Sequence, residues 1–252
     1  MPSFSWAREQ QRYCSIIFVL SVLLSMLLIN EIKEQLGKEA AQLVQQDMII
    51  GIGSGSTVFF LINALAERIQ HGLSCTAVPT SEQTRLLAVQ KGIKLLTLNE
   101  ITSTDLTIDG ADEIDLQLTA IKGGGGALLQ EKMVAAASKQ LMIIADDSKL
   151  VSMLGDFPLP IEVIAYGWKQ VQQQIEEIYK IKVALRKIND HPFITDHGHY
   201  ILDCYFGEIT DSASLNISLH LIPGVVETGL FINMVDMAII GYPDGELKRL
   251  TR

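Results

Sequence analysis

Short apolar segments alternate with helical segments from residue 48 to residue 145, and this alternation constrains the fold more than any other feature. The predicted strands are 48–50, 75–78, 94–96, 106–108 and 141–145. The predicted helices are 31–46, 58–69, 81–91 and 127–139. This alternation predicts a doubly wound parallel sheet with helices on both faces. Ligands of such sheets bind beyond the carboxyl ends of the strands.

The pattern changes near Pro158. From residue 161 to about 225 the order becomes strand, helix (168–179), strand, hairpin, helix (212–221) and strand, which predicts a small α+β domain. The apolar residues 237–241 are then predicted to add one more strand to the first sheet.

The amino terminus carries an apolar run at 13–29, preceded by Arg8 and Arg12. Three interpretations stay open: a membrane anchor, a secretory signal, or an extension translated from a start codon upstream of a true start at Met26. No small-x-small cleavage site follows the run. An anchor with the arginines inside would place the next domain outside the cell. We expect the extension to be nonessential and the chain to be cytoplasmic.

Composition narrows the classes of function. Hydrophobic residues make up 48% of the chain, enough for a sizeable core. The formal charge of -9 argues against a nucleic-acid groove, so an anionic substrate would need local cations or backbone amides. Cys14, Cys75 and Cys204 are widely separated and odd in number, which predicts no disulfide framework and a reduced compartment.

A glycine-rich turn, Gly51–Thr57, joins a predicted strand to a predicted helix. Glycines allow close backbone approach, and a helix start offers free N–H groups to an anion. Ser54, Ser56 and Thr57 add hydroxyl groups. The dinucleotide fingerprint requires glycine at position 56, and no acidic residue ends the second strand to hold a ribose. We predict a monophosphate site, with a dinucleotide site or a structural turn as the alternatives.

Three further segments follow predicted strands or open a predicted helix. Asp109, Asp112 and Glu113 crowd one strand end, where carboxylates repel unless cations or a ligand are present; the alternative is a solvated loop. Lys122 precedes the four glycines 123–126, whose amides can converge on an oxyanion; the alternative is a flexible linker.

The helix after the glycines and the third segment, 145–149, each add one side chain. Glu131 lies just over one helical turn beyond the glycines, within reach of whatever they bind; alone, it would pass for an exposed carboxylate. Lys149 follows another strand and could pair with a phosphate or remain a surface lysine. The turn containing His197 and His199, with Asp196 and His191 nearby, could hold a metal, but a solvated hairpin is the favoured interpretation.

Taken together, these segments resemble the A type of ribose-5-phosphate isomerase. The resemblance covers residues 30–245 in order and spacing, and IDGADE followed by KGGGGAL and then Glu-Lys is its most specific part. Gly126 departs from the pattern, since relatives often have Ala there. The motifs that carry the resemblance are GIGSGST, IDGADEID, IKGGGGALLQEK, ADDSK, GDFPLPIEV and IPGVVETGLF.

The resemblance implies interconversion of D-ribose 5-phosphate and D-ribulose 5-phosphate in the nonoxidative pentose phosphate pathway. It implies a Rossmann-like catalytic domain (30–156 and 226–252) and a smaller α+β, ferredoxin-like domain (157–225) inserted before the last strand, after the apolar extension 1–29. It further implies a small phosphorylated sugar as substrate, no metal or organic cofactor, no nucleic-acid partner, no membrane partner beyond the apolar run, and a homo-oligomer.

The same resemblance implies roles for individual residues. Glu131 matches the proton acceptor, and Asp109, Asp112 and Lys122 match the other catalytic groups. Lys33 is a weaker match to a lysine near the phosphate. The implied substrate-binding residues are Ser54, Gly55, Ser56, Thr57, Asp109, Gly110, Ala111, Asp112, Lys122, Gly123, Gly124, Gly125 and Lys149.

Chemistry supports this assignment, because one carboxylate can move a proton between adjacent carbons through a cis-enediolate. We expect neighbouring carboxylates and burial to raise the pKa of Glu131, and Lys122 with the glycine amides to stabilise the negative oxygen. Two alternatives stay open: a coenzyme A transferase with a glutamate nucleophile, and a sugar-phosphate sensor of a transcription regulator. The sensor would need a DNA-binding module, and residues 1–29 are too short and apolar to supply one.

Overall fold

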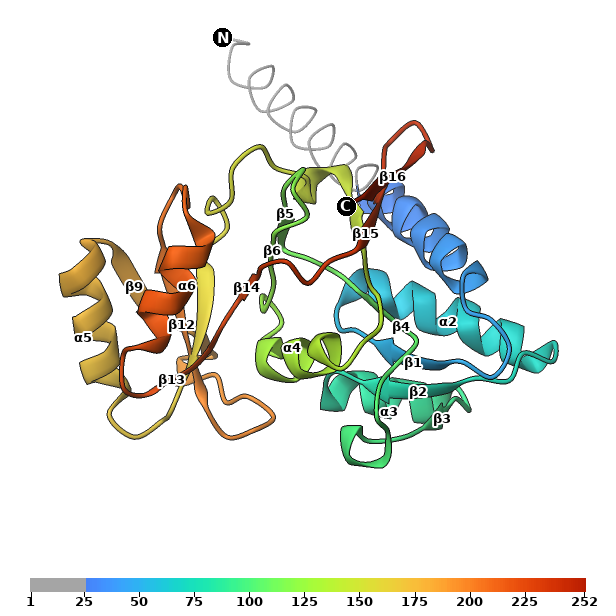
Figure 1. Ribbon diagram of the computed structural model, residues 1–252, viewed down its shortest axis with the longest axis horizontal. Coiled ribbons are helices and arrows are strands. Elements are labelled where there is room, and N and C mark those ends of the chain that lie inside the picture. The colour runs from blue at the N-terminus through green and yellow to red at the C-terminus, as the bar shows by residue number, and fades with distance from the viewer. Residues whose placement is uncertain (1–25) are drawn as a thin grey trace, which may run out of the picture.

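The structure, a computed structural model, describes residues 26–252 and is built around a seven-stranded sheet (Figure 1). A helix over 26–42 precedes it. The sheet runs in the order β16-β15-β7-β4-β1-β2-β3, with every neighbouring pair parallel except β15 and β16. The strands are β1 (Ile49–Ile52), β2 (Thr76–Pro79), β3 (Lys94–Leu95), β4 (Leu106–Asp109), β7 (Leu141–Asp146), β15 (Met237–Gly241) and β16 (Leu247–Thr251).

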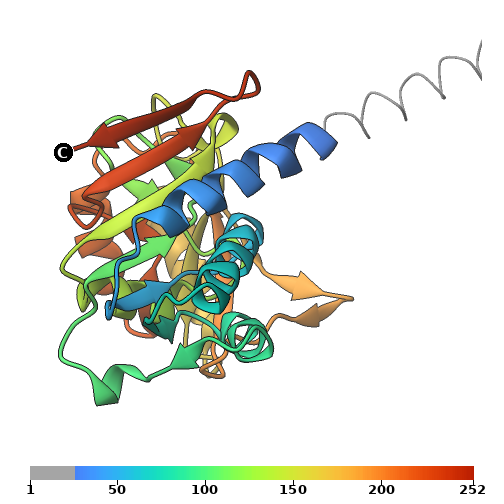
Figure 2. The same ribbon diagram turned by 90° about the vertical axis from the view of Figure 1, so that its right-hand side faces the viewer.

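The two faces of this sheet pack against different elements. On one face, Ile50, Ile108 and Ile144 join the core formed with helix 26–42, α2 (Ser56–Gln70) and α3 (Glu82–Gln90). On the other face, Ile143 and Ile240 pack against α4 (Leu128–Ala136) and a three-stranded sheet. Figure 2 shows helix 26–42 lying along the first face. The strands of the three-stranded sheet are β5 (Glu113–Ile114), β6 (Ala120–Ile121) and β14 (Leu230–Phe231).

A four-stranded antiparallel sheet, ordered β13-β8-β12-β9, forms the second part of the molecule. Its chain order, β-α-β-β-α-β, and its strand order are those of the ferredoxin-like arrangement. A short hairpin of β10 and β11 is inserted before β12, and Figure 2 shows it projecting from the body. The elements are β8 (Leu159–Val163), α5 (Trp168–Tyr179), β9 (Lys182–Leu185), β10 (Lys187–Ile188), β11 (His191–Pro192), β12 (Tyr200–Tyr205), α6 (Ser212–His220) and β13 (Val225–Thr228).

The predicted fold class is confirmed, and α5 and β15 have the predicted bounds. The prediction of helices on both faces is incomplete, because the second face carries α4 together with the three-stranded sheet. Its two-residue strands are too short to give a periodic signal. The charged edge strand β16 was also missed. The predicted domain boundaries stay a prediction.

The apolar run at the amino terminus falls mostly on residues 1–25, which lie outside the described residues, so its three interpretations stay open. Among residues 26–252, no helix combines the length and apolar character that crossing a bilayer requires.

The strand order places the switch point of the sheet at β1. The chain leaves β1 toward β2 and β3, then returns to add β4 on the other side of β1. Connections that leave in opposite directions open a crevice at the carboxyl ends of such strands. The turn after β1 and the acidic loop after β4 therefore meet at this crevice.

Candidate active site

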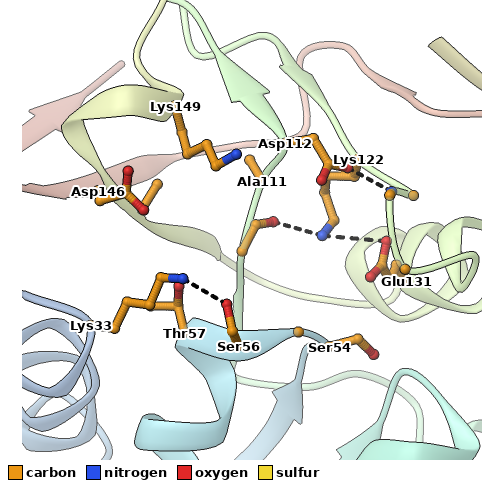
Figure 3. Close-up of a pocket in the computed structure, with 16 residues that line it drawn as sticks. Lys33, Ser54, Ser56, Thr57, Ala111, Asp112, Lys122, Glu131, Asp146 and Lys149 are labelled. Carbon is orange, nitrogen blue, oxygen red and sulfur yellow. Dashed lines mark hydrogen bonds and ion pairs between the residues drawn. The ribbon is translucent and has the colours of Figure 1, made fainter. Parts of the chain in front are cut away.

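A cavity of about 210 Å³ opens at the carboxyl ends of β1, β4 and β7 (Figure 3). It gathers residues from the turn before α2, the acidic loop after β4, the glycine run before α4 and the segment after β7. The lining residues are Lys33, Ser54, Gly55, Ser56, Thr57, Gly110, Ala111, Asp112, Lys122, Gly123, Gly124, Gly125, Glu131, Ala145, Asp146 and Lys149. All predicted site residues line the cavity except Asp109.

The turn before α2 forms one end of the cavity. Ser56 and Thr57 are the first two residues of α2, which has no acidic residue in its first turn. Their N–H groups precede the first intrahelical bond, and the helix dipole adds partial positive charge. The Ser56 hydroxyl accepts a hydrogen bond from Lys33 Nζ at 2.9 Å, and Lys149 extends into the cavity from the opposite wall (Figure 3). This end is suited to a phosphate.

The hydroxyl of Ser54 has a different role from those of Ser56 and Thr57. Ser54 Oγ donates to Ser81 Oγ at 2.7 Å and lies 2.9 Å from Thr80 Oγ1. Thr84 Oγ1 then donates to the carbonyl of Gly53 at 2.7 Å. This hydroxyl cluster ties the turn to the start of α3. Sequence reasoning missed it because its threonines and Ser81 follow a different strand.

Asp109 ends β4 and is buried, with 1% of its surface exposed. Its Oδ1 accepts hydrogen bonds from the N–H groups of Ser54 (3.0 Å) and Gly110 (2.7 Å), and its Oδ2 lies 3.0 Å from Lys122 Nζ. Gly53 allows this approach, since a Cβ there would lie 2.0 Å from Asp109 Oδ1. Asp109 therefore fixes the turn and Lys122 and does not face the cavity.

Lys122 is the buried cation of the site. Its ammonium donates to the carbonyl of Gly110 at 2.7 Å and lies 3.4 Å from Glu131 Oε2. Burial lowers the pKa of Lys122, but the charges of Asp109 and Glu131 outweigh this and keep the pKa above its ordinary value. Lys122 is therefore protonated at neutral pH.

Glu131 lies in the first turn of α4 and faces the cavity with 4% of its surface exposed. Its Oε2 accepts no hydrogen bond, although Lys122 is nearby. Burial, opposed by Lys122 and reinforced by Asp109 and Asp112, raises the pKa of Glu131 to about 8. A carboxylate with a pKa near the working pH is suited to transferring protons in both directions.

The glycine run curves around Asp112. Gly124 N–H donates to Asp112 Oδ2 at 2.7 Å, and Gly123, Gly124 and Gly125 all line the cavity. Arg186, which lies between β9 and β10, donates to the carbonyls of Gly123 and Gly124 from the other side. No local pattern marks Arg186, because it lies more than sixty residues beyond the glycines in the chain.

The histidine turn takes no part in this cavity. His199 Nδ1 lies 2.9 Å from the buried Glu162, and Asp196 accepts a hydrogen bond from the N–H of Glu82 at the start of α3. Within residues 26–252, no three His, Cys, Asp or Glu side chains are grouped so that they could hold a metal ion.

Comparison with known proteins identifies the family. The model of the ribose 5-phosphate isomerase A (phosphoriboisomerase A) family matches residues 76–245. Ribose-5-phosphate isomerase A of Bacillus cereus (strain ATCC 10987 / NRS 248) is 55% identical over 215 residues, which are 85% of this chain and 97% of that protein. The protein of the same name from Rhodopseudomonas palustris (strain BisB18) is 49% identical over 222 residues, 86% of this chain and 96% of its own.

Solved structures agree with the sequence comparison. Ribose 5-phosphate isomerase from Plasmodium falciparum superposes with a TM-score of 0.87 at 39% identity, covering 89% of this chain and 99% of its own. Ribose 5-phosphate isomerase A from Methanocaldococcus jannaschii gives a TM-score of 0.83 at 37% identity, covering 88% of this chain and 99% of its own. The chain therefore belongs to the ribose 5-phosphate isomerase A family.

Proposed function

We propose that the cavity described above is the active site and that Glu131 is its base. The chain is an aldose–ketose isomerase of the pentose phosphate pathway, which interconverts D-ribose 5-phosphate and D-ribulose 5-phosphate. The observation that supports this most is the buried carboxylate of Glu131, whose Oε2 accepts no hydrogen bond and lies 3.4 Å from the buried ammonium of Lys122. That pair provides both a proton acceptor and a positive charge for the oxygen that becomes negative.

Burial and hydrogen bonding together distinguish Glu131 from Asp109 and Asp112. Both oxygens of Asp109 are occupied, by two amides and by Lys122. Asp112 accepts from Gly124 N–H. Glu131 lines the cavity, and its Oε2 faces Lys122 without a hydrogen bond, so this carboxylate can take a proton from one carbon of the substrate and return it to the next. A single carboxylate on one face of the enediolate is sufficient for both transfers.

The remaining groups divide between the two ends of the cavity. Lys33, Ser56, Thr57 and Lys149 hold the phosphate at the start of α2. Lys122 and the amides of Gly123 and Gly125 stabilise the enediolate oxygens at the opposite end, while the amide of Gly124 donates to Asp112. Ring opening requires a group that exchanges protons with the sugar oxygens, and this falls to Asp112, which lines the cavity, or to the pair of Asp109 and Lys122.

The decisive experiment measures turnover and solvent-deuterium incorporation together. In D₂O, the wild type should convert ribose 5-phosphate and place deuterium on C1 of the ribulose 5-phosphate that forms, the carbon to which the proton is delivered, with or without a chelator. Glu131→Gln should lower both rates by about 10²-fold or more while still binding phospho-erythronic acid, the compound with which one similar isomerase was solved.

Glu162→Gln is a matched control, because among the described residues Glu162 is the other carboxylate with a buried, unpartnered oxygen. It lies on β8, paired with Thr195 and His199. We expect this variant to retain turnover. Near-normal turnover in Glu131→Gln would overturn the assignment of the base. Trapping a glutamyl thioester with an acyl-coenzyme A would favour the transferase alternative.

Three further expectations concern the assembly, the location and the domains of the protein. We expect a homo-oligomer, checked by light scattering, and a cytoplasmic location, checked by cell fractionation. We also expect residues 157–225 to form a domain separate from the catalytic one, so limited proteolysis should cut near residues 156 and 225 first. Recovery from the membrane fraction alone would contradict the expected location.

A further inference from the structure

We propose that Arg186, held by Asp203, is a positioning residue that orients the peptide units of the glycine run toward the substrate. The inference rests on the proposed function, because it assigns a cause to the orientation of the amides that face the enediolate. It concerns a side chain that does not line the cavity.

The contacts of Arg186 form a two-sided clamp. One guanidinium nitrogen, Nη1, donates to the carbonyl of Gly123 at 2.7 Å and to that of Gly124 at 2.9 Å. On the other side, Nε donates to Asp203 Oδ2 at 3.0 Å and Nη2 donates to Asp203 Oδ1. Both side chains are about 15% exposed, so solvent screens the pair only weakly. A bidentate pair of this kind fixes the plane of the guanidinium.

Peptide geometry converts this clamp into an orientation of the amides. In a planar trans peptide, the C=O and the N–H point in opposite directions. Because Arg186 binds the carbonyls of Gly123 and Gly124, the N–H groups of Gly124 and Gly125 must point away from the guanidinium. The hydrogen bond from Gly124 N–H to Asp112 Oδ2, on the cavity side, has this direction. The positive charge also polarises both peptide units.

A glycine run needs such a restraint. Glycine loses more conformational freedom on ordering than any other residue, so four in a row would otherwise sample many peptide orientations. Phe193 restrains the run at its end: Gly126 has φ +80°, and a Cβ there would lie 2.2 Å from Phe193 Cε1. Arg186, Phe193 and Asp203 all lie between the end of β9 and the end of β12, so this part of the chain shapes the active-site loop.

The test compares Arg186→Ala and Arg186→Lys with Arg249→Ala. Arg249 is a matched control, because it also pairs with a carboxylate, Glu39, but lies on the edge strand β16. We expect Arg186→Ala to lower kcat by about 10²-fold, as a misplaced transition-state contact does, while KM and the inhibition constant for inorganic phosphate hardly change. Lysine cannot bind two carbonyls and Asp203 in one plane, so Arg186→Lys should recover little.

Chemical rescue separates positioning from a general loss of structure. Millimolar guanidinium chloride, far below denaturing concentrations, should restore part of the kcat of Arg186→Ala and leave Glu131→Gln inactive. If Arg186→Ala does not fold, Asp203→Asn replaces it, with an intermediate loss of kcat expected.

The outcomes separate this proposal from the proposed function. Unchanged kcat in the folded variants, a loss confined to KM, or a lost kcat that guanidinium does not restore would overturn the positioning role. A wild-type chain without isomerase turnover would instead overturn the proposed function.

Discussion

Replacing Glu131 by Gln is predicted to stabilise the folded chain at neutral and alkaline pH while removing most of its turnover. The unfolded chain holds this carboxyl at its ordinary pKa of 4.5, whereas burial, opposed by Lys122, raises the pKa in the folded chain to about 8. A carboxyl whose pKa is raised on folding contributes stability below pH 4.5 that is lost as pH rises toward 8. The glutamine side chain of the variant carries no titrating proton and avoids this loss.

The size of the effect follows from the two pKa values. Between pH 6 and pH 8 the folded wild type keeps most of this proton and the unfolded chain has lost it, so unfolding releases nearly one proton. Integrating the linkage relation over this interval lowers the free energy of unfolding of the wild type by about 2 kcal/mol relative to the Gln variant. Titrating groups that are not in contact with Glu131 are common to both proteins and cancel in the difference.

Urea denaturation at pH 6, 7 and 8 measures this difference, with the slope of each transition used to confirm that both proteins unfold in the same way. The gap between the variant and the wild type should widen steadily with pH. A gap that is constant across the interval, or one that closes, would show that the folded pKa of Glu131 is not raised and would refute the reasoning.

Three other substitutions test separate parts of the site. Gly53→Ala brings a Cβ within 2.0 Å of Asp109 Oδ1, so kcat/KM should fall by about 10²-fold. Steady-state kinetics measures this, and an unchanged kcat/KM would contradict the prediction. Lys33→Ala removes a cation beside Ser56 and should raise KM by about tenfold with kcat kept. Glu113→Gln leaves one of the N–H groups of Gly155 and Phe157 poorly paired and should cost about 1–3 kcal/mol in thermal unfolding.

The sequence predicts most of the sheet and nearly every cavity residue, because strand ends on one edge of a parallel sheet must meet. The glycine turn after β1 and the acidic loop after β4 needed no long-range information beyond this rule. Asp109 is the exception: its place in the acidic motif suggests contact with substrate, whereas its side chain turns inward to two amides and Lys122. Residue type alone does not distinguish these orientations.

Features that arise from contacts between distant segments could not be predicted. Arg186 reaches the glycine run across sixty-two residues of sequence, and the hydroxyls of Ser54 and Thr80 meet across twenty-six. The three-stranded sheet has strands of two residues, too short for periodicity to mark. In each case the tertiary fold creates the interaction.

The burial of Glu131, which destabilises the folded chain, also favours catalysis. Its net effect on the rate depends on how much carboxylate is ionised and on how basic that carboxylate is. At pH 7, a pKa of about 8 leaves roughly one tenth of Glu131 as the reactive carboxylate. The pKa is raised from 4.5, so if half of this gain in basicity reaches the transition state, the ionised form reacts on the order of 50-fold faster. Multiplying the ionised fraction by the faster rate of the ionised form gives a net increase in rate of roughly fivefold at pH 7. It follows that kcat/KM should rise with pH up to about 8 and then level off, with the stability of the wild type falling over the same interval. A rate that is flat from pH 6 to pH 8 would show that the carboxyl of Glu131 does not titrate in this interval and would refute the link between its burial and the rate.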